Sequence, residues 1–212
     1  MTFGKPRAMG GRTAKPTGGG GGASADGRPA PRQRPARKVR EATPAYLEAA
    51  GLWYLERFAA SADKVRRLLM RKVTMSAKEH GTSEEQGAET VDRLVKRFIE
   101  LGLIRDRDLA VARAGRMHEK GTSRRMIQAK LGAMGLGTDD VAAALREVSE
   151  NADGNSEQEA AWALAKRKKL GPYRAEAERE ERRQKDMGVL ARAGFSFDIA
   201  RRVIDASEPP GR

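Results

Sequence analysis

The sequence predicts an all-α protein made of tandem three-helix, helix-turn-helix-like repeats that form an elongated, curved array of about nine helices. Aromatic residues make up only 5% of the 212 residues, and such a composition favours many thin contacts between helices over a wide sheet. From residue 43 onward, apolar side chains recur at spacings of three and four, which is the period of one helix face. A short motif that closes one helix and opens the next also occurs three times.

The first predicted repeat contains three helices with recognisable starts. Thr43 and Pro44 provide an N-cap and a proline at the first helical position. Ser61 can cap a second helix, and Ser83 with Gln86 forms a capping box for a third. Residues 78–82, between the second and third helices, are expected to form a loop. The apolar face of the first helix comprises Tyr46, Leu47, Ala50, Tyr54, Leu55 and Phe58.

The motif that occurs three times has the pattern apolar-x-x-x-Gly-apolar-x-x-Asp. The glycine can adopt the left-handed conformation that ends a helix, and the apolar residue after it folds back on the last turn. The aspartate begins the next helix, where the macrodipole favours an acid. Each copy therefore predicts a joint between two helices. The copies are Phe98, Gly102, Leu103 and Asp106; Leu131, Gly135, Leu136 and Asp139; and Leu190, Gly194, Phe195 and Asp198.

Helices are predicted after the joints, over 106–119, 139–148 and 198–205, and Ser156 with Glu159 forms a capping box for one more. The joints are offset by 33 and then by 59 residues, a difference that a longer helix over 174–193 would explain. The predicted repeats span 43–105, 106–151 and 152–206, followed by a disordered tail over 207–212. A repeat of about 50 residues has too small a core to be stable alone, so neighbouring repeats are expected to stack.

Positive charge is concentrated near the N-terminus. The formal net charge is +13, and residues 1–40 contain ten basic residues and one acid, so +9 of the total lies there. Residues 1–42 are also rich in Gly and Pro and are expected to form a disordered basic arm. An organelle transit peptide is the alternative, but that class normally contains an amphipathic helix. A polycationic arm indicates a polyanionic partner such as DNA.

The chain has no Cys, which excludes disulfides, thiolate zinc sites and thiol catalysis and fits a reducing compartment. It also lacks a long apolar segment. We therefore expect a cytoplasmic protein without membrane contact.

No residues form a recognisable catalytic or metal-binding set, so we expect neither enzymatic activity nor a cofactor. His80 and His118 lack a second His at the spacing of a metal pair and are expected on the surface. Paired acids at 84–85 and 139–140 fall in predicted first turns, where they compensate the helix macrodipole.

Clusters of basic residues are the candidate binding sites. A basic run on a helix is often only a solvated face, but three clusters in one array favour contact with a polyanion. Trp53 and Trp162 are expected to pack in the core or between repeats, because single-strand binders usually interleave exposed aromatic residues with Arg. The candidates are Arg66, Arg67, Arg71 and Lys72; Arg124, Arg125 and Lys130; and Lys166, Arg167, Lys168 and Lys169.

Several of these motifs together resemble the RecX family of RecA regulators. The resemblance rests on the stretch Tyr54-Leu55-x-Arg57-Phe58-x-x-Ser61, on the Phe98 to Asp106 joint and on the Leu190 to Phe195 segment, and it covers about residues 43–206. It implies three tandem three-helix repeats. Arg57, in the first stretch, is a further candidate for contact with RecA or DNA.

The resemblance also implies a function in DNA repair, homologous recombination and the SOS response. Family members lie in the groove of a RecA filament on single-stranded DNA and limit strand exchange, ATP hydrolysis and repressor cleavage. We accordingly expect a monomer that binds the RecA nucleoprotein filament. Weaker contact with single-stranded DNA is expected through the basic patches and the N-terminal arm.

A transcriptional or nucleoid protein that reads DNA through one of the joints is the main alternative, and the basic arm favours it. However, the helices after the joints are rich in Ala and acids. Such residues are poorly suited to reading base edges in a groove that is flanked by phosphates. A helical enzyme is a third possibility, but the sequence shows no convergent nucleophile, base or metal set.

Overall fold

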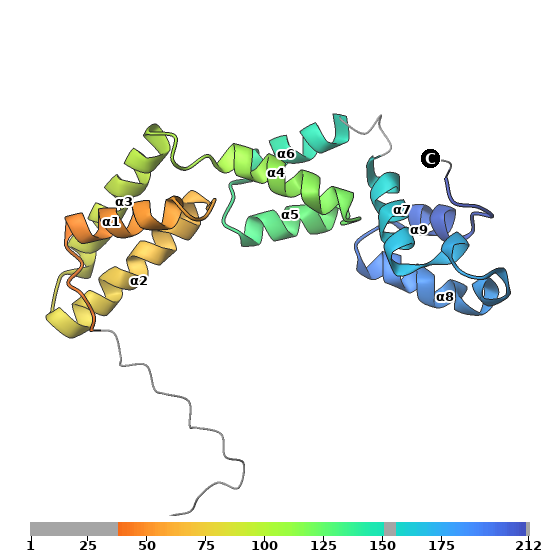
Figure 1. Cartoon of the computed structure of the whole chain (residues 1–212), viewed down its shortest axis with the longest axis horizontal. Helices are drawn as coiled ribbons and strands as arrows, with labels where there is room; N and C mark the ends of the chain where they lie inside the picture. The colour runs from red at the N-terminus through yellow and green to blue at the C-terminus, as the bar shows by residue number, and fades with distance from the viewer. Residues whose placement is uncertain (1–37, 151–155, 211–212) are drawn as a thin grey trace, which may run out of the picture. The chain divides into compact units, whose positions relative to one another are not determined.

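The computed structural model describes residues 38–150 and 156–210. These residues form nine α-helices, one turn of 3-10 helix and no β-strand, so the predicted all-α class is confirmed. None of the described helices has the length and apolar character needed to cross a membrane. Residues 1–37 of the predicted arm, residues 151–155 and residues 211–212 lie outside the described residues. The elements are α1 (Pro44–Leu55), α2 (Ala62–His80), α3 (Glu84–Glu100), α4 (Asp106–Glu119), α5 (Arg124–Ala133), α6 (Thr138–Glu150), α7 (Ser156–Lys168), η1 (Gly171–Tyr173), α8 (Glu176–Arg192) and α9 (Phe197–Ile204) (Figure 1).

The described helices pack in groups of three, and each group has its own apolar core. The first bundle, α1 to α3, buries Leu69 and Phe98 at its centre. The second, α4 to α6, is centred on Ile127, and the third, α7 to α9, on Leu190 and Val203. We propose that these three bundles are the three predicted repeats.

The predicted helix starts of the first bundle are confirmed. The side chains of Thr43, Ser61 and Ser83 each accept a hydrogen bond from the backbone N–H three residues later. The predicted loop over 78–82 is wrong for its first three residues, because α2 continues to His80 and ends at Gly81, whose φ is +69°. The first helix is also shorter than predicted, and Phe58 lies beyond its end, half-exposed.

All three predicted joints are present. In each, the apolar residue after the glycine donates its backbone N–H to the carbonyl five residues earlier, across 2.9 Å at Leu103, 3.3 Å at Leu136 and 3.2 Å at Phe195. The glycines have φ between +68° and +91°, as this helix-ending motif requires. The aspartate of each copy lies in the first turn of the following helix.

The unequal spacing of the joints has a different cause from the predicted long helix. α8 has 17 residues, the same length as α3, although it is longer than the 10-residue α5. The first joint connects α3 of one bundle to α4 of the next, whereas the other two lie inside bundles, between α5 and α6 and between α8 and α9. Two helices therefore separate the first pair of joints and three separate the second pair.

Two further helices end with the same hydrogen bond. Thr122 donates to Met117 at the end of α4, and Leu170 donates to Ala165 at the end of α7. The left-handed position is occupied by Gly121 in the first case and by Lys169, with φ +54°, in the second. Lys169 is the single non-glycine residue with positive φ in the described chain, and this conformation costs a side chain about 1 kcal/mol relative to glycine.

Buried serines connect successive bundles. Ser61, the N-cap of α2, donates its hydroxyl across 2.7 Å to the carbonyl of Met134, the C-cap of α5. Ser123, the N-cap of α5, donates across 2.6 Å to the carbonyl of Ala193, the C-cap of α8. The positive N-terminal end of one helix dipole therefore meets the negative C-terminal end of another at both contacts. α8 has Ala175 at its N-cap and no side-chain cap.

Two aspartates accept backbone N–H groups, one between bundles and one within the third bundle. The carboxylate of Asp106 accepts the backbone N–H of Ala62, at 3.1 and 3.2 Å, and so attaches the start of α4 to the start of α2. Burial raises the pKa of Asp106, an effect that the hydrogen bond from Ala62 partly offsets. Asp186 is buried in the third bundle, where burial tends to raise its pKa, but hydrogen bonds from Arg174 and Gly171 outweigh burial and lower the pKa overall.

We predict that Ser123→Ala lowers the free energy of unfolding by about 2–3 kcal/mol, because it removes an N-cap and also leaves the Ala193 carbonyl without its donor. Ser196→Ala is the matched control, since Ser196 caps α9 but is exposed and its side chain makes no hydrogen bond to another bundle within the described residues; it should cost about 1 kcal/mol. Urea unfolding followed by circular dichroism measures both. Equal losses would contradict the connecting role of Ser123.

Gly121→Ala and Gly102→Ala are expected to differ sharply in stability. Both glycines have nearly the same φ, +70° and +68°, so the backbone strain of an alanine is similar. A Cβ at Gly121 would lie 2.6 Å from the Ala160 carbonyl oxygen of α7, whereas at Gly102 it would meet only the Arg105 side chain at 3.6 Å. Thermal unfolding should show a small loss for Gly102→Ala and a larger loss for Gly121→Ala. Similar melting temperatures would show that α4 and α7 separate at little cost.

Candidate nucleic-acid interface

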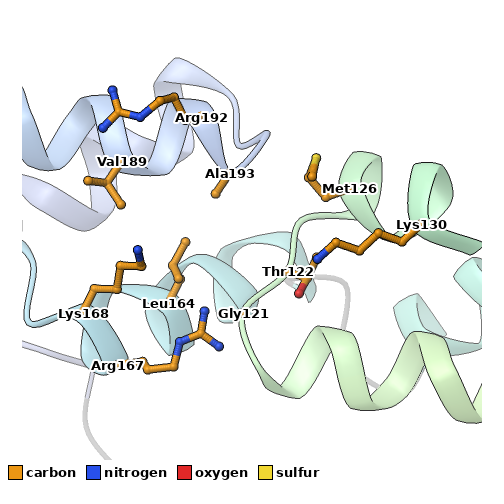
Figure 2. Close-up of a pocket in the computed structure, with 10 residues that line it drawn as sticks. All are labelled: Gly121, Thr122, Met126, Lys130, Leu164, Arg167, Lys168, Val189, Arg192 and Ala193. Carbon is orange, nitrogen blue, oxygen red and sulfur yellow. The ribbon is translucent and has the colours of Figure 1, made fainter. Parts of the chain in front are cut away.

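A cavity of about 320 Å³ lies where the second and third bundles meet, and four cationic side chains line it. Lys130 comes from α5, Arg167 and Lys168 from α7, and Arg192 from the end of α8 (Figure 2). None of the described residues that line the cavity is acidic. The remaining lining residues are Gly121, Thr122, Met126, Leu164, Val189 and Ala193.

The Ser123 contact is what brings these cations together. It joins the start of α5 to the end of α8, so Ala193 and its neighbour Arg192 lie against the second bundle. Gly121 lets the end of α4 approach the backbone of α7, which carries Arg167 and Lys168. The cavity is therefore assembled by the same glycine and serine that connect the bundles.

The four cations are not equivalent. Arg167 donates from Nη1 to the carbonyl of Lys120, the C-cap of α4, across 2.6 Å, so it also holds the two bundles together. Lys130, Lys168 and Arg192 take part in none of the ion pairs found within the described chain. Like charges that share an open cavity without a carboxylate favour an anionic ligand.

Two of the three predicted clusters meet at this cavity. Lys130 comes from the cluster on α5, and Arg167 and Lys168 come from the cluster on α7. Arg124, Arg125, Lys166 and Lys169 are exposed and do not line the cavity. Arg124 is partly engaged elsewhere, since its Nη1 donates to Ser149 and its backbone N–H to Glu157.

The predicted cluster on α2 belongs to the first bundle, and acids within the bundle partly neutralise it. Arg66 pairs with Asp92 at 3.2 Å, and Arg67 pairs with Asp63 at 2.6 Å. Lys72 donates to the phenol oxygen of Tyr46. The exposed Arg71 is the remaining member of this cluster.

The expectation that Trp53 packs in the core is wrong. Its side chain is 56% exposed, and the guanidinium of Arg57 lies 4.4 Å from the centre of its ring. Arg57 also donates to the Trp53 carbonyl across 3.0 Å. Trp162, by contrast, is partly buried against the core of the third bundle and contacts Tyr173 edge to face. An exposed aromatic ring beside Arg is the arrangement that single-strand binders use.

A second cavity, of about 420 Å³, lies between the end of α1 and α4. Phe58 and Leu103, both about half-exposed, contribute apolar surface to it. Its cations are Arg105, Arg113 and Arg116, and its acid, Asp108, lies 3.8 Å from Arg105. This cavity is more apolar than the first and suits a protein surface better than a phosphate.

Sequence patterns missed Arg192, Arg113 and Arg116. Each is an isolated arginine without a basic neighbour, and only the packing of the helices brings it to a cavity. The two histidines have structural contacts: His80 is exposed and bonds to Val39, while His118 is partly buried and lies 2.6 Å from the Ser156 carbonyl. No group of three or more potential metal ligands occurs within residues 38–150 and 156–210.

The chain is similar to curated bacterial proteins. It is 38% identical to Regulatory protein RecX of Myxococcus xanthus over 177 residues, which cover 83% of this chain and 93% of that protein. It is 33% identical to Regulatory protein RecX of Agrobacterium fabrum over 84 residues, 40% of this chain and 42% of that protein. No family model and no solved structure gives a significant match. The similarity along nearly the whole length of the first relative confirms the resemblance seen in the sequence, and the chain belongs to the RecX family.

Proposed function

We propose that this chain is a non-enzymatic regulator of the RecA recombinase that binds in the groove of the RecA filament on single-stranded DNA. In this role it limits ATP hydrolysis, strand exchange and repressor cleavage, and it acts as a cytoplasmic monomer. Membership of the RecX family supports a regulatory role. The observation that carries the proposal further is the cavity between the second and third bundles, where four cations from three helices meet.

The two cavities suit the two kinds of surface that a nucleoprotein filament presents. Such a filament offers both protein surface and phosphates. The cavity beside α1 and α4 combines half-exposed Phe58 and Leu103 with arginines, which suits a protein surface. The cavity lined by Lys130 and Arg192 suits an anion. A ligand that carries both kinds of surface fits this chain better than naked DNA does.

Inhibition in this proposal is steric. A body seated in the groove occupies space that an incoming duplex or a repressor needs, and it contacts more than one protomer. The basic side chains accelerate encounter and make binding sensitive to salt.

The helices that follow the joints argue against a direct reader of DNA sequence. In a helix-turn-helix reader, residues near the start of the second helix approach the bases. Here the first turns contain Asp106 in α4, Asp139 and Asp140 in α6, and Asp198 in α9. Carboxylates at these positions would be repelled by the phosphates beside the groove.

Fluorescence anisotropy with a labelled single strand tests the proposal. The strand is presented either bare or coated with RecA and a slowly hydrolysed ATP analogue, and we expect at least about tenfold tighter binding to the coated strand. The chain should also lower the steady-state rate of ATP hydrolysis by RecA on unlabelled single strands. Equal affinity for both forms with no effect on hydrolysis, or sequence-dependent binding to duplex DNA, would favour a direct DNA-binding protein.

Trp53→Ala is predicted to weaken binding to the RecA-coated strand by about tenfold, because an exposed aromatic residue beside an arginine is a typical energetic centre of an interface. Its melting temperature should change little, since the side chain is largely exposed. Phe197→Ala is the matched control, because Phe197 is an aromatic residue that is 66% exposed on α9. Equal losses for the two variants would assign no special role to Trp53.

A further inference from the structure

The turn after α7 places a lysine where the chain otherwise uses glycine. Four helix ends with the same hydrogen bond have Gly102, Gly121, Gly135 or Gly194 in the left-handed position, and the fifth has Lys169. Glycine is free to adopt this conformation, whereas a lysine is strained by it.

The neighbouring residues hold Lys169 in this conformation. Leu170, which follows it, is 3% exposed and donates its backbone N–H to Ala165. Gly171 donates its backbone N–H across 3.0 Å to the carboxylate of Asp186, which is itself buried by the third bundle and paired with Arg174. The backbone N–H of Lys169 itself donates to the carbonyl of Lys166 across 3.2 Å. The backbone is therefore held on both sides of residue 169 and cannot relax to relieve the strain.

Folding does not account for a lysine at this position. Its side chain is exposed and takes part in none of the ion pairs or hydrogen bonds recorded for the described residues. A cation near a helix C-terminus compensates the dipole, but Lys166, Arg167 and Lys168 already lie in the last turn of α7. Strained residues that persist without a folding benefit are typical of binding sites.

Lys169 directly follows Lys168, which lines the cationic cavity between the second and third bundles. The cavity also has Lys130 on α5 and Arg192 on α8, and neither is paired with an acid in the described chain. Its apolar lining residues are aliphatic or Met, and none is aromatic. A small anion with several acceptor oxygens fits this arrangement better than an acidic peptide, which normally needs an apolar anchor.

We propose that this cavity, together with Lys169, binds phosphodiester groups of single-stranded DNA. The inference deepens the proposed function, on which it rests for the filament as the source of that DNA. Because the cations belong to two bundles, a bound phosphate also connects the second bundle to the third. Ligand binding therefore stabilises the junction that Ser123 forms.

The test measures anisotropy of a fluorescein-labelled oligothymidylate, bare of RecA, with the full chain and single variants. Lys130→Gln and Arg192→Gln should each weaken binding several-fold and reduce the slope of log affinity against log salt by about 0.7 per lost phosphate contact. Lys96→Gln is the control for loss of one charge, because Lys96 is exposed on α3 of the first bundle. Lys96→Gln should leave both the affinity and the slope nearly unchanged, because Lys96 does not line the cavity. The N-terminal arm is the same in every variant, so any difference between variants comes from the substituted residue.

Lys169→Gly gives the sharpest test, because it is expected to increase thermal stability and to decrease affinity for oligothymidylate. It should raise the melting temperature by about 2–4 °C, through relief of the left-handed strain, while it weakens oligothymidylate binding several-fold. A higher melting temperature with unchanged binding would overturn the role of Lys169. Variants of Lys130 and Arg192 that lose affinity for poly-glutamate but not for oligothymidylate would overturn the assignment to DNA.

The inference and the proposed function fail in different measurements. The first is decided by bare oligothymidylate and melting temperatures, with no RecA present. The second is decided by ATP hydrolysis and by the preference for the coated strand. A wild-type chain that binds oligothymidylate through the cavity but leaves RecA unaffected would overturn the proposed function alone. A chain that inhibits RecA while the cavity variants bind oligothymidylate normally would overturn the inference alone.

Discussion

The architecture depends on two serine hydroxyls that each form two hydrogen bonds. Ser61 and Ser123 accept a backbone N–H at the start of their own helices and donate to the last carbonyl of a helix in the next bundle. Both are almost fully buried, at 2% and 0% exposure, so water cannot replace the partner. A single polar atom thus satisfies two helix ends that would otherwise be buried without partners.

These contacts also determine which cationic side chains come together at the cavity between the second and third bundles. The start of α5 meets the end of α8, and for that reason Lys130 and Arg192, 62 positions apart in the sequence, line one cavity. The glycine that precedes Ser123 by two residues lets α4 approach α7 and brings Arg167 and Lys168 to the same place. The cationic cavity is a product of bundle stacking and not of any one bundle.

Local features were predictable because local sequence determines them. The N-caps at Thr43, Ser61 and Ser83 and the three glycine joints depend on residues within one turn of the helix end. The docking of helix ends was not predictable, because Ser123 looks like an ordinary N-cap until Ala193 is placed against it. The same limit applies to Trp53, because only the packing of the helices decides which side chains of α1 are covered.

The N-cap of the middle helix differs in the third bundle, and the difference bears on how the junctions between bundles affect stability and ligand binding. α8 has Ala175 where α2 and α5 have serine, so its start offers no hydroxyl to a further helix end. Each bundle has a small core, and its stability depends on the neighbour it contacts. Stacked bundles of this kind gain much of their stability from the interfaces between them. A ligand that contacts two bundles therefore stabilises the interface on which both of them depend. The strained Lys169, one residue beyond α7, directly follows Lys168, which lines the cavity at one of these interfaces.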